Sequence, residues 1–201
     1  MTGLRKDLLA ATIAIVLLTL LLGVVYPLLT TGISQILFPS AANGSKIEVD
    51  GKVVGSKLIG QDFRDLPRYF QSRPSATEYS ADVTNFNNLG PNNRELSEFF
   101  REELVSYLAR ERRYDPGISA ADVPVDAITT SASGVDPQIS AANARIQAHR
   151  VAAVRGLPLR QVLDLVSANT AGRFLALFGE PGVNVLELNL ALDKTRGEGR
   201  R

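Results

Sequence analysis

The chain has 201 residues and a formal net charge of +1, from 22 basic and 21 acidic side chains. It contains no cysteine and a single histidine, which excludes disulfide bonds, thiolate metal sites and His-rich zinc sites. The near-neutral charge gives no electrostatic support for a nucleic-acid partner.

An uncharged apolar run covers residues 8–25. As an α-helix it would span about 27 Å, close to the roughly 30 Å hydrocarbon core of a bilayer. Tyr26 suits the membrane interface, and Pro27 would end or kink the helix. We therefore expect a transmembrane helix over residues 8–29, with a linker or helix extension over residues 30–45.

A cleaved signal peptide is the alternative to a retained anchor, because Ser40-Ala41-Ala42 offers small residues to a peptidase. The apolar region of a signal peptide has only about 7–15 residues, and these small residues lie far beyond the end of the run. We therefore favour an anchor. Within it, Gly23 is small enough for close packing against another membrane helix, and a lipid-facing position is the alternative.

Charges beside the run set its orientation. Arg5 and Lys6 precede it, and the next basic residue is Lys46. Because positive flanks stay inside the cell, we expect residues 1–7 to be cytoplasmic and residues 46–192 to form an extracytoplasmic domain.

The first elements of that domain have clear sequence signals. Asp50-Gly51, between alternating apolar residues, predicts a β-hairpin with a type I′ turn. Asn92 or Asn93 can cap a helix over residues 94–112, whose apolar residues recur at spacings of three and four.

Two more helices are expected further along. Asp136 can cap one that Pro137 opens and Gly156 ends, after a short strand that begins near Val123. Pro158 would open the other, with apolar residues on its buried face.

The alternating residues 183–192 predict a last strand, and the charged residues 193–201 a disordered tail. The expected fold class is α+β: one N-terminal transmembrane helix followed by a single mixed α/β extracytoplasmic domain.

The sequence Asp193-Lys194-Thr195 is the one in which P-type ion pumps present their phosphorylated aspartate. Arg196 stands where the pumps have glycine, and too little chain follows to supply a nucleotide domain. We therefore interpret Asp193 as part of a solvated tail. A serine hydrolase is not indicated either, because no G-x-S-x-G turn presents a serine to His149.

Hydroxyl groups gather at Thr129, Thr130, Ser131 and Ser133, ahead of an expected helix. Local bonding of these side chains to the backbone of a turn is one interpretation. The other is a rigid surface whose oxygen atoms face a partner or an alkali cation. The sequence does not separate the two.

Six stretches, taken in order, resemble the C subunit of Kdp-type potassium-transporting ATPases. They are GSKLIGQDF (55–63), YFQSRPSAT (69–77), NLGPNN (88–93), PVDAITTSASGVDPQIS (124–140), IQAHRVAAVRG (146–156) and GVNVLELNLAL (182–192). The resemblance covers nearly the whole chain, including the single N-terminal span.

The resemblance implies a non-catalytic accessory subunit of an ATP-driven, high-affinity potassium uptake complex in the bacterial inner membrane. Its expected partners are a channel-like potassium subunit, a P-type ATPase subunit and the lipid bilayer. The complex uses ATP and potassium, and no cofactor or metal is expected on this chain itself.

Two roles are proposed in the family. One is a catalytic chaperone that raises the ATP affinity of the ATPase subunit, with a nucleotide contact that would fall on Gln147. The other is a cap over the external potassium entrance that also stabilises the complex. We expect the cap to use the loop of Thr129, Thr130, Ser131, Ser133, Gly134 and Asp136. A membrane-anchored periplasmic binding or hydrolase domain is the alternative from another class.

Overall fold

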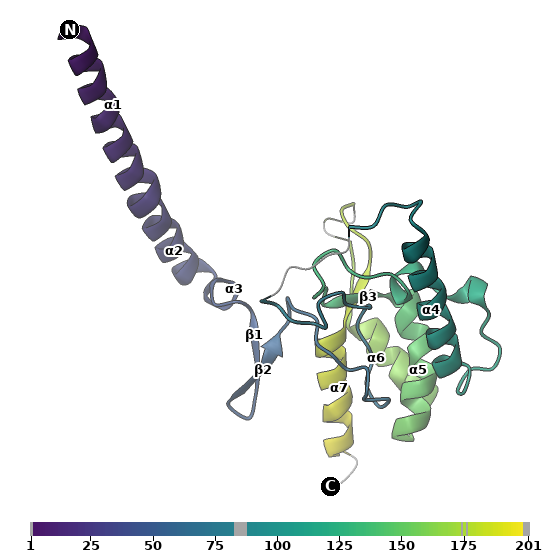
Figure 1. The fold of residues 1–201 in the computed structure, drawn as a ribbon. Helices are drawn as coiled ribbons and strands as arrows, with labels where there is room; N and C mark the ends of the chain where they lie inside the picture. The colour runs from purple at the N-terminus through teal and green to yellow at the C-terminus, as the bar shows by residue number, and fades with distance from the viewer. Residues whose placement is uncertain (1, 83–87, 174, 176, 199–201) are drawn as a thin grey trace. The chain divides into compact units, whose positions relative to one another are not determined.

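The computed structural model describes residues 2–82, 88–173, 175 and 177–198 (Figure 1). The chain divides into two units, Met1–Ile47 and Glu48–Arg201. The first is a long helix with a short one after it, and the second is a mixed helix and sheet domain. This confirms the expected α+β class with one N-terminal apolar helix.

The long apolar helix consists of α1 (Thr2–Leu20), a π turn (Leu21–Val25) and α2 (Tyr26–Leu37), followed by the short α3 (Pro39–Ala42). Its segment Gly3–Leu37 is long and apolar enough to cross a membrane, and none of its most apolar window is buried within the protein. The apolar helix therefore runs beyond residue 29, to Leu37.

The π turn explains why Pro27 does not end this helix. Proline has no N–H, and its ring would meet the carbonyl group four residues earlier, which belongs to Gly23. In the structure the Tyr26 N–H bonds to the Leu21 carbonyl, five residues back rather than four. This wider turn makes room for the proline ring.

A two-stranded hairpin, β1 (Lys46–Val49) and β2 (Lys52–Ser56), follows α3 along the chain. Asp50 and Gly51 both have positive φ, +51° and +74°, as a type I′ turn requires, which confirms the prediction.

The domain then forms α4 (Arg94–Glu111), α5 (Ala141–Arg155), α6 (Leu159–Ala168) and α7 (Val185–Glu198). Two 3₁₀ turns, Ala120–Asp122 and Val125–Ala127, lie between α4 and α5. The strands β3 (Gln138–Ser140), β4 (Thr170–Ala171) and β5 (Gly182–Asn184) form an antiparallel sheet in the order β3-β5-β4.

Several predicted helix ends are confirmed. Asn93 caps α4 by accepting a hydrogen bond from the Glu95 N–H at 2.8 Å. Gly156 ends α5 in the left-handed region with φ +67°, and α6 begins directly after Pro158.

The predicted start of α5 at Asp136 and Pro137 is wrong. Residues 138–140 form β3 instead, because buried Ile139 pairs with Val183 of β5. The helix starts four residues later, where the Ser140 hydroxyl accepts from the Asn143 N–H at 3.0 Å. The short strand expected near Val123 is also wrong, since a 3₁₀ turn follows there.

The predicted strand over residues 183–192 is correct only to Asn184. The Asn184 side chain accepts a bond from the Glu187 N–H at 3.0 Å and so starts α7. This helix buries Leu188 and Leu192, one turn apart. It continues to Glu198, into the segment that the sequence suggested was disordered.

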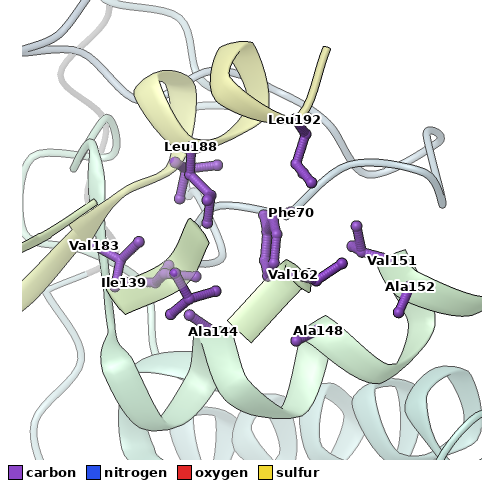
Figure 2. Close-up of a cluster of buried hydrophobic side chains, with 12 residues drawn as sticks. Phe70, Ile139, Ala144, Ala148, Val151, Ala152, Val162, Val183, Leu188 and Leu192 are labelled. Carbon is purple, nitrogen blue, oxygen red and sulfur yellow. The ribbon is translucent and has the colours of Figure 1, made fainter. Parts of the chain in front are cut away.

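The main core lies between α5, α6, α7 and the sheet (Figure 2). Phe70, from the long segment between β2 and α4, inserts between α7 and α5 with no exposed surface. A second, smaller core joins α4 to the 3₁₀ turns.

Candidate functional site

Side-chain amides hold the backbone of residues 67–71 between two helices. On one side, Asn189 of α7 accepts from the Phe70 N–H at 2.8 Å and donates to its carbonyl at 2.9 Å. On the other side, Gln147 of α5 accepts from the Gln71 N–H at 2.7 Å and donates to its carbonyl at 3.1 Å. Each amide thus supplies the backbone hydrogen bonds that Phe70 and Gln71, which belong to no strand, would otherwise lack.

The Gln147 amide has no hydrogen-bonding capacity left over. Its Oε1 also accepts from Arg150 at 2.9 Å, and its Nε2 also donates to Asn143 Oδ1 at 2.9 Å. Two acceptor and two donor positions are all that a glutamine amide offers. The side chain is 1% exposed, so a nucleotide contact by Gln147 would require these bonds to break.

The space beside Gln147 is also small. A cavity of about 100 Å³ adjoins it, lined by residues that include Tyr79 and Tyr107. Sites for small organic ligands typically measure about 300–1,000 Å³. A nucleotide therefore has neither a free partner nor sufficient room at this position.

A buried ion pair extends the same network to α4. Arg150 Nε lies 3.1 and 3.2 Å from the two carboxylate oxygens of Glu111, and both side chains are 1% exposed. The Arg150 Nη1 group donates to the carbonyls of Pro67 and Tyr69. Burial lowers the pKa of Arg150, and the Glu111 carboxylate opposes that effect.

The sequence did not single out Glu111, Asn143, Arg150 or Asn189, although all four are buried. The sequence pattern that could have identified them is a polar residue on the apolar side of a helix. Such a residue either carries function or satisfies other buried polar groups. Here Arg150 and Asn189 bind backbone groups, and Glu111 and Asn143 bind other side chains.

The loop of residues 129–136 is held from inside by Arg73. The guanidinium group donates to Asp136 Oδ2 at 3.1 Å, to the Thr129 hydroxyl at 3.2 Å and to the Thr130 carbonyl at 3.2 Å. Ser75 adds a hydroxyl bond to the Gly134 carbonyl. These oxygen atoms of the loop therefore have partners within the domain, on residues 73–75.

Burial leaves only the tip of this loop free. Ser131 and Gly134 are buried, Thr129, Thr130 and Asp136 are half-buried, and Ala132 and Ser133 are exposed. Because Arg73 neutralises the Asp136 carboxylate, the loop is a poor cation site. Among the described residues, no group of three His, Asp or Glu side chains could hold a metal ion.

Two glycines are required by this packing. Gly134 has φ +72°, and a Cβ atom there would lie 2.6 Å from the Thr77 hydroxyl. A Cβ at Gly60 would lie 2.5 Å from the Asp136 carbonyl oxygen. The loop thus fits closely against segments that lie far earlier in the chain.

Asp193 links three parts of the domain through hydrogen bonds of its carboxylate. Its carboxylate accepts from the Tyr69 hydroxyl at 2.7 Å and from Arg155 at 2.9 Å, which joins α7 to α5 and to residues 67–71. The Arg155 side chain is itself 2% exposed. This bonding gives Asp193 a role that the solvated-tail interpretation missed.

The other residues considered in the sequence analysis do not form a common site. His149 lies 4.0 Å from Asp115, on the α5 surface, and neither Ser131 nor Ser133 is among its partners. Gly23 lies in the π turn, where a Cβ would meet only Thr19, at 4.0 Å.

Gln147→Ala should lower the free energy of unfolding of the domain by about 2–4 kcal/mol, because the Gln71 N–H and carbonyl would remain buried without partners. The measurement is urea unfolding of the full chain in detergent, followed by far-UV circular dichroism. Gln161→Ala, at an exposed position of α6, is the matched control and should change stability by less than about 0.5 kcal/mol. Equal stability of the two variants would contradict the structural role of Gln147.

The domain should also lose stability at alkaline pH. Burial raises the pKa of Tyr79 to about 12 and raises that of Tyr107, whose hydroxyl donates to Asn143. An unfolded tyrosine has a pKa of about 10, so the folded state holds these protons more tightly. The contribution of these tyrosines to stability should therefore be constant below about pH 10 and fall above it, by about 1.4 kcal/mol per pH unit for each of them. Urea unfolding between pH 8 and 11 tests this, and Tyr79→Phe should reduce the slope.

The sequence is similar to known proteins over nearly its whole length. Residues 8–194 match the family described as KdpC, the c chain of the K⁺-transporting ATPase. The potassium-transporting ATPase KdpC subunit of Caldanaerobacter subterraneus subsp. tengcongensis is 50% identical over 172 residues, 86% of either chain. Those of Methylococcus capsulatus and Polaromonas naphthalenivorans are 50% and 52% identical, over 92% and 91% of this chain and 96% and 92% of their own. With a family match over nearly its whole length, the chain belongs to the KdpC subunits of potassium-transporting ATPases.

Proposed function

We propose that this chain is a non-catalytic accessory subunit that works outside the cytoplasm. Its single helix anchors it in the inner membrane with the N-terminus inside, as the basic residues Arg5 and Lys6 favour. Its domain binds the potassium-selective and P-type ATPase subunits of an ATP-driven uptake complex, stabilises their assembly and covers the external potassium entrance.

The observation that carries this proposal is the internally bonded loop of residues 129–136. Arg73 and Ser75 occupy its inward oxygen atoms, so the loop has a fixed shape and an uncharged tip at Ala132 and Ser133. A rigid, neutral surface suits a protein contact because little side-chain freedom is lost on binding. It suits a cap better than a site that binds the cation itself.

The membrane helix offers a second contact for assembly. The Tyr26 N–H is bonded to Leu21, and Pro27 has no N–H, so the Leu22 carbonyl lacks both of the donors that a regular or widened turn would give it. A carbonyl group within a bilayer needs a donor from a neighbour. Adjacent Gly23 leaves space for that neighbour, which we assign to a helix of a partner subunit.

A direct contact between Gln147 and ATP is the alternative, and the contacts of this side chain speak against it. The amide is buried and fully bonded, and the cavity beside it is small. An influence of this chain on ATP affinity would then have to pass through its partners.

Ser133→Trp tests the capping role, because it changes the exposed tip while leaving the bonds of Arg73 intact. In the assembled complex it should shift the apparent potassium affinity of ATPase activity by about fivefold, the effect of losing about 1 kcal/mol at a docking contact. Gln161→Trp, on the exposed face of α6, is the control and should leave that affinity unchanged. An unchanged potassium affinity in Ser133→Trp would contradict capping, and an altered ATP affinity alone would favour the nucleotide-linked role.

A further inference from the structure

An apolar tip projects from the connection between β4 and β5. Leu175, Leu177 and Phe178 are 70%, 75% and 62% exposed. Single exposed residues such as Val105 or Val125 are ordinary features of a protein surface, but three large apolar side chains within four residues are not. The three side chains therefore form an exposed apolar cluster.

The local geometry presents this tip outward. Leu175 has φ +51°, a left-handed conformation that is unfavourable for a bulky side chain, and its exposed side chain makes no compensating core contact. At the base of the tip, Arg173 Nη2 lies 2.8 and 2.9 Å from the two carboxylate oxygens of Glu180. This ion pair contains the only charges between residues 170 and 182, so the tip itself is uncharged.

We propose that the tip of Leu175, Leu177 and Phe178 inserts into the surface of the lipid bilayer. The chain carries its own membrane helix, and only the ten residues 38–47 separate that helix from the unit that bears the tip. Fully extended, such a segment spans no more than about 36 Å. The connection therefore limits how far the domain can lie from the end of that helix.

The chemistry of the tip fits a lipid surface better than a shaped protein groove. A convex group of leucine and phenylalanine side chains can enter the boundary between headgroups and acyl chains, about 5–10 Å deep, without a matching cavity. The Arg173–Glu180 pair then lies at the level of the polar headgroups. Because that pair satisfies its own charges, it leaves none that a protein partner would have to match.

The insertion gives the domain a second attachment to the membrane. One flexible connection allows a domain to rotate freely, whereas two points of attachment restrict its rotation and raise the effective concentration of its surfaces at the membrane. This inference concerns the chain alone and does not depend on the capping role.

The absence of tryptophan from the chain makes the test direct. Phe178→Trp in the full chain places a single fluorophore at the tip, and Val125→Trp, at a site of 70% exposure, is the matched control. Both variants are reconstituted without other subunits into phosphatidylcholine vesicles whose acyl chains carry bromine near the headgroup. Fluorescence quenching by bromine and by aqueous acrylamide is then measured.

If the tip inserts, bromolipid should quench the F178W emission about threefold more strongly than that of V125W, at the depth of the headgroup boundary, and acrylamide should quench it less. Equal accessibility of both variants to acrylamide, with no bromolipid quenching of F178W, would overturn the proposal. Protection of F178W that arises only when the partner subunits are added, without quenching by bromolipid, would also overturn it and would assign the tip to a protein contact.

Discussion

The domain depends on the way that residues 67–71 are bound from both sides. Phe70 and Gln71 are buried and belong to no β-strand, so their N–H and carbonyl groups would otherwise lack partners. Gln147 and Asn189 each satisfy both groups of one residue, and Arg150 binds two further carbonyls. Because these side chains come from α5 and α7, and Glu111 adds α4, one segment joins three helices.

The same segment continues into the support of the surface loop. Immediately after Gln71, the side chains of Arg73 and Ser75 bond to residues 129–136, and Thr77 packs against Gly134. The motif YFQSRPSAT therefore has a first half that fixes the helices and a second half that fixes the loop.

The elements of the fold that depend only on residues close together in the sequence could be predicted. The apolar run, the Asp50-Gly51 turn, the Asn93 cap and the Gly156 end each depend on neighbouring residues only. The prediction of a strand over residues 183–192 was wrong beyond Asn184, because the leucines of this segment alternate with other residues as in a strand. In α7 the buried positions Leu188 and Leu192 instead follow the helical spacing, once Asn184 has started the helix.

The site could be predicted only in part for a related reason. Hydroxyl groups at Thr129 and Ser131 mark an unusual loop, but the Thr129 hydroxyl accepts from Arg73 and the Ser131 N–H donates to Pro74, both more than fifty residues earlier in the chain. Nothing local in the sequence pairs Arg73 with Asp136, or Asp193 with Tyr69. Residues that bind distant backbone resemble candidate ligand contacts until the fold supplies those partners.

The side of the membrane on which the domain lies decides between an external role and a direct contact with ATP. Proteolysis of right-side-out and inverted vesicles, with a tag on the N-terminus as the internal control, measures this for the assembled complex. We expect the domain to be cleaved only in right-side-out vesicles and the tag only in inverted ones, which keeps Gln147 away from cytoplasmic ATP. Cleavage of the domain in inverted vesicles alone would contradict it and would place the domain beside the nucleotide.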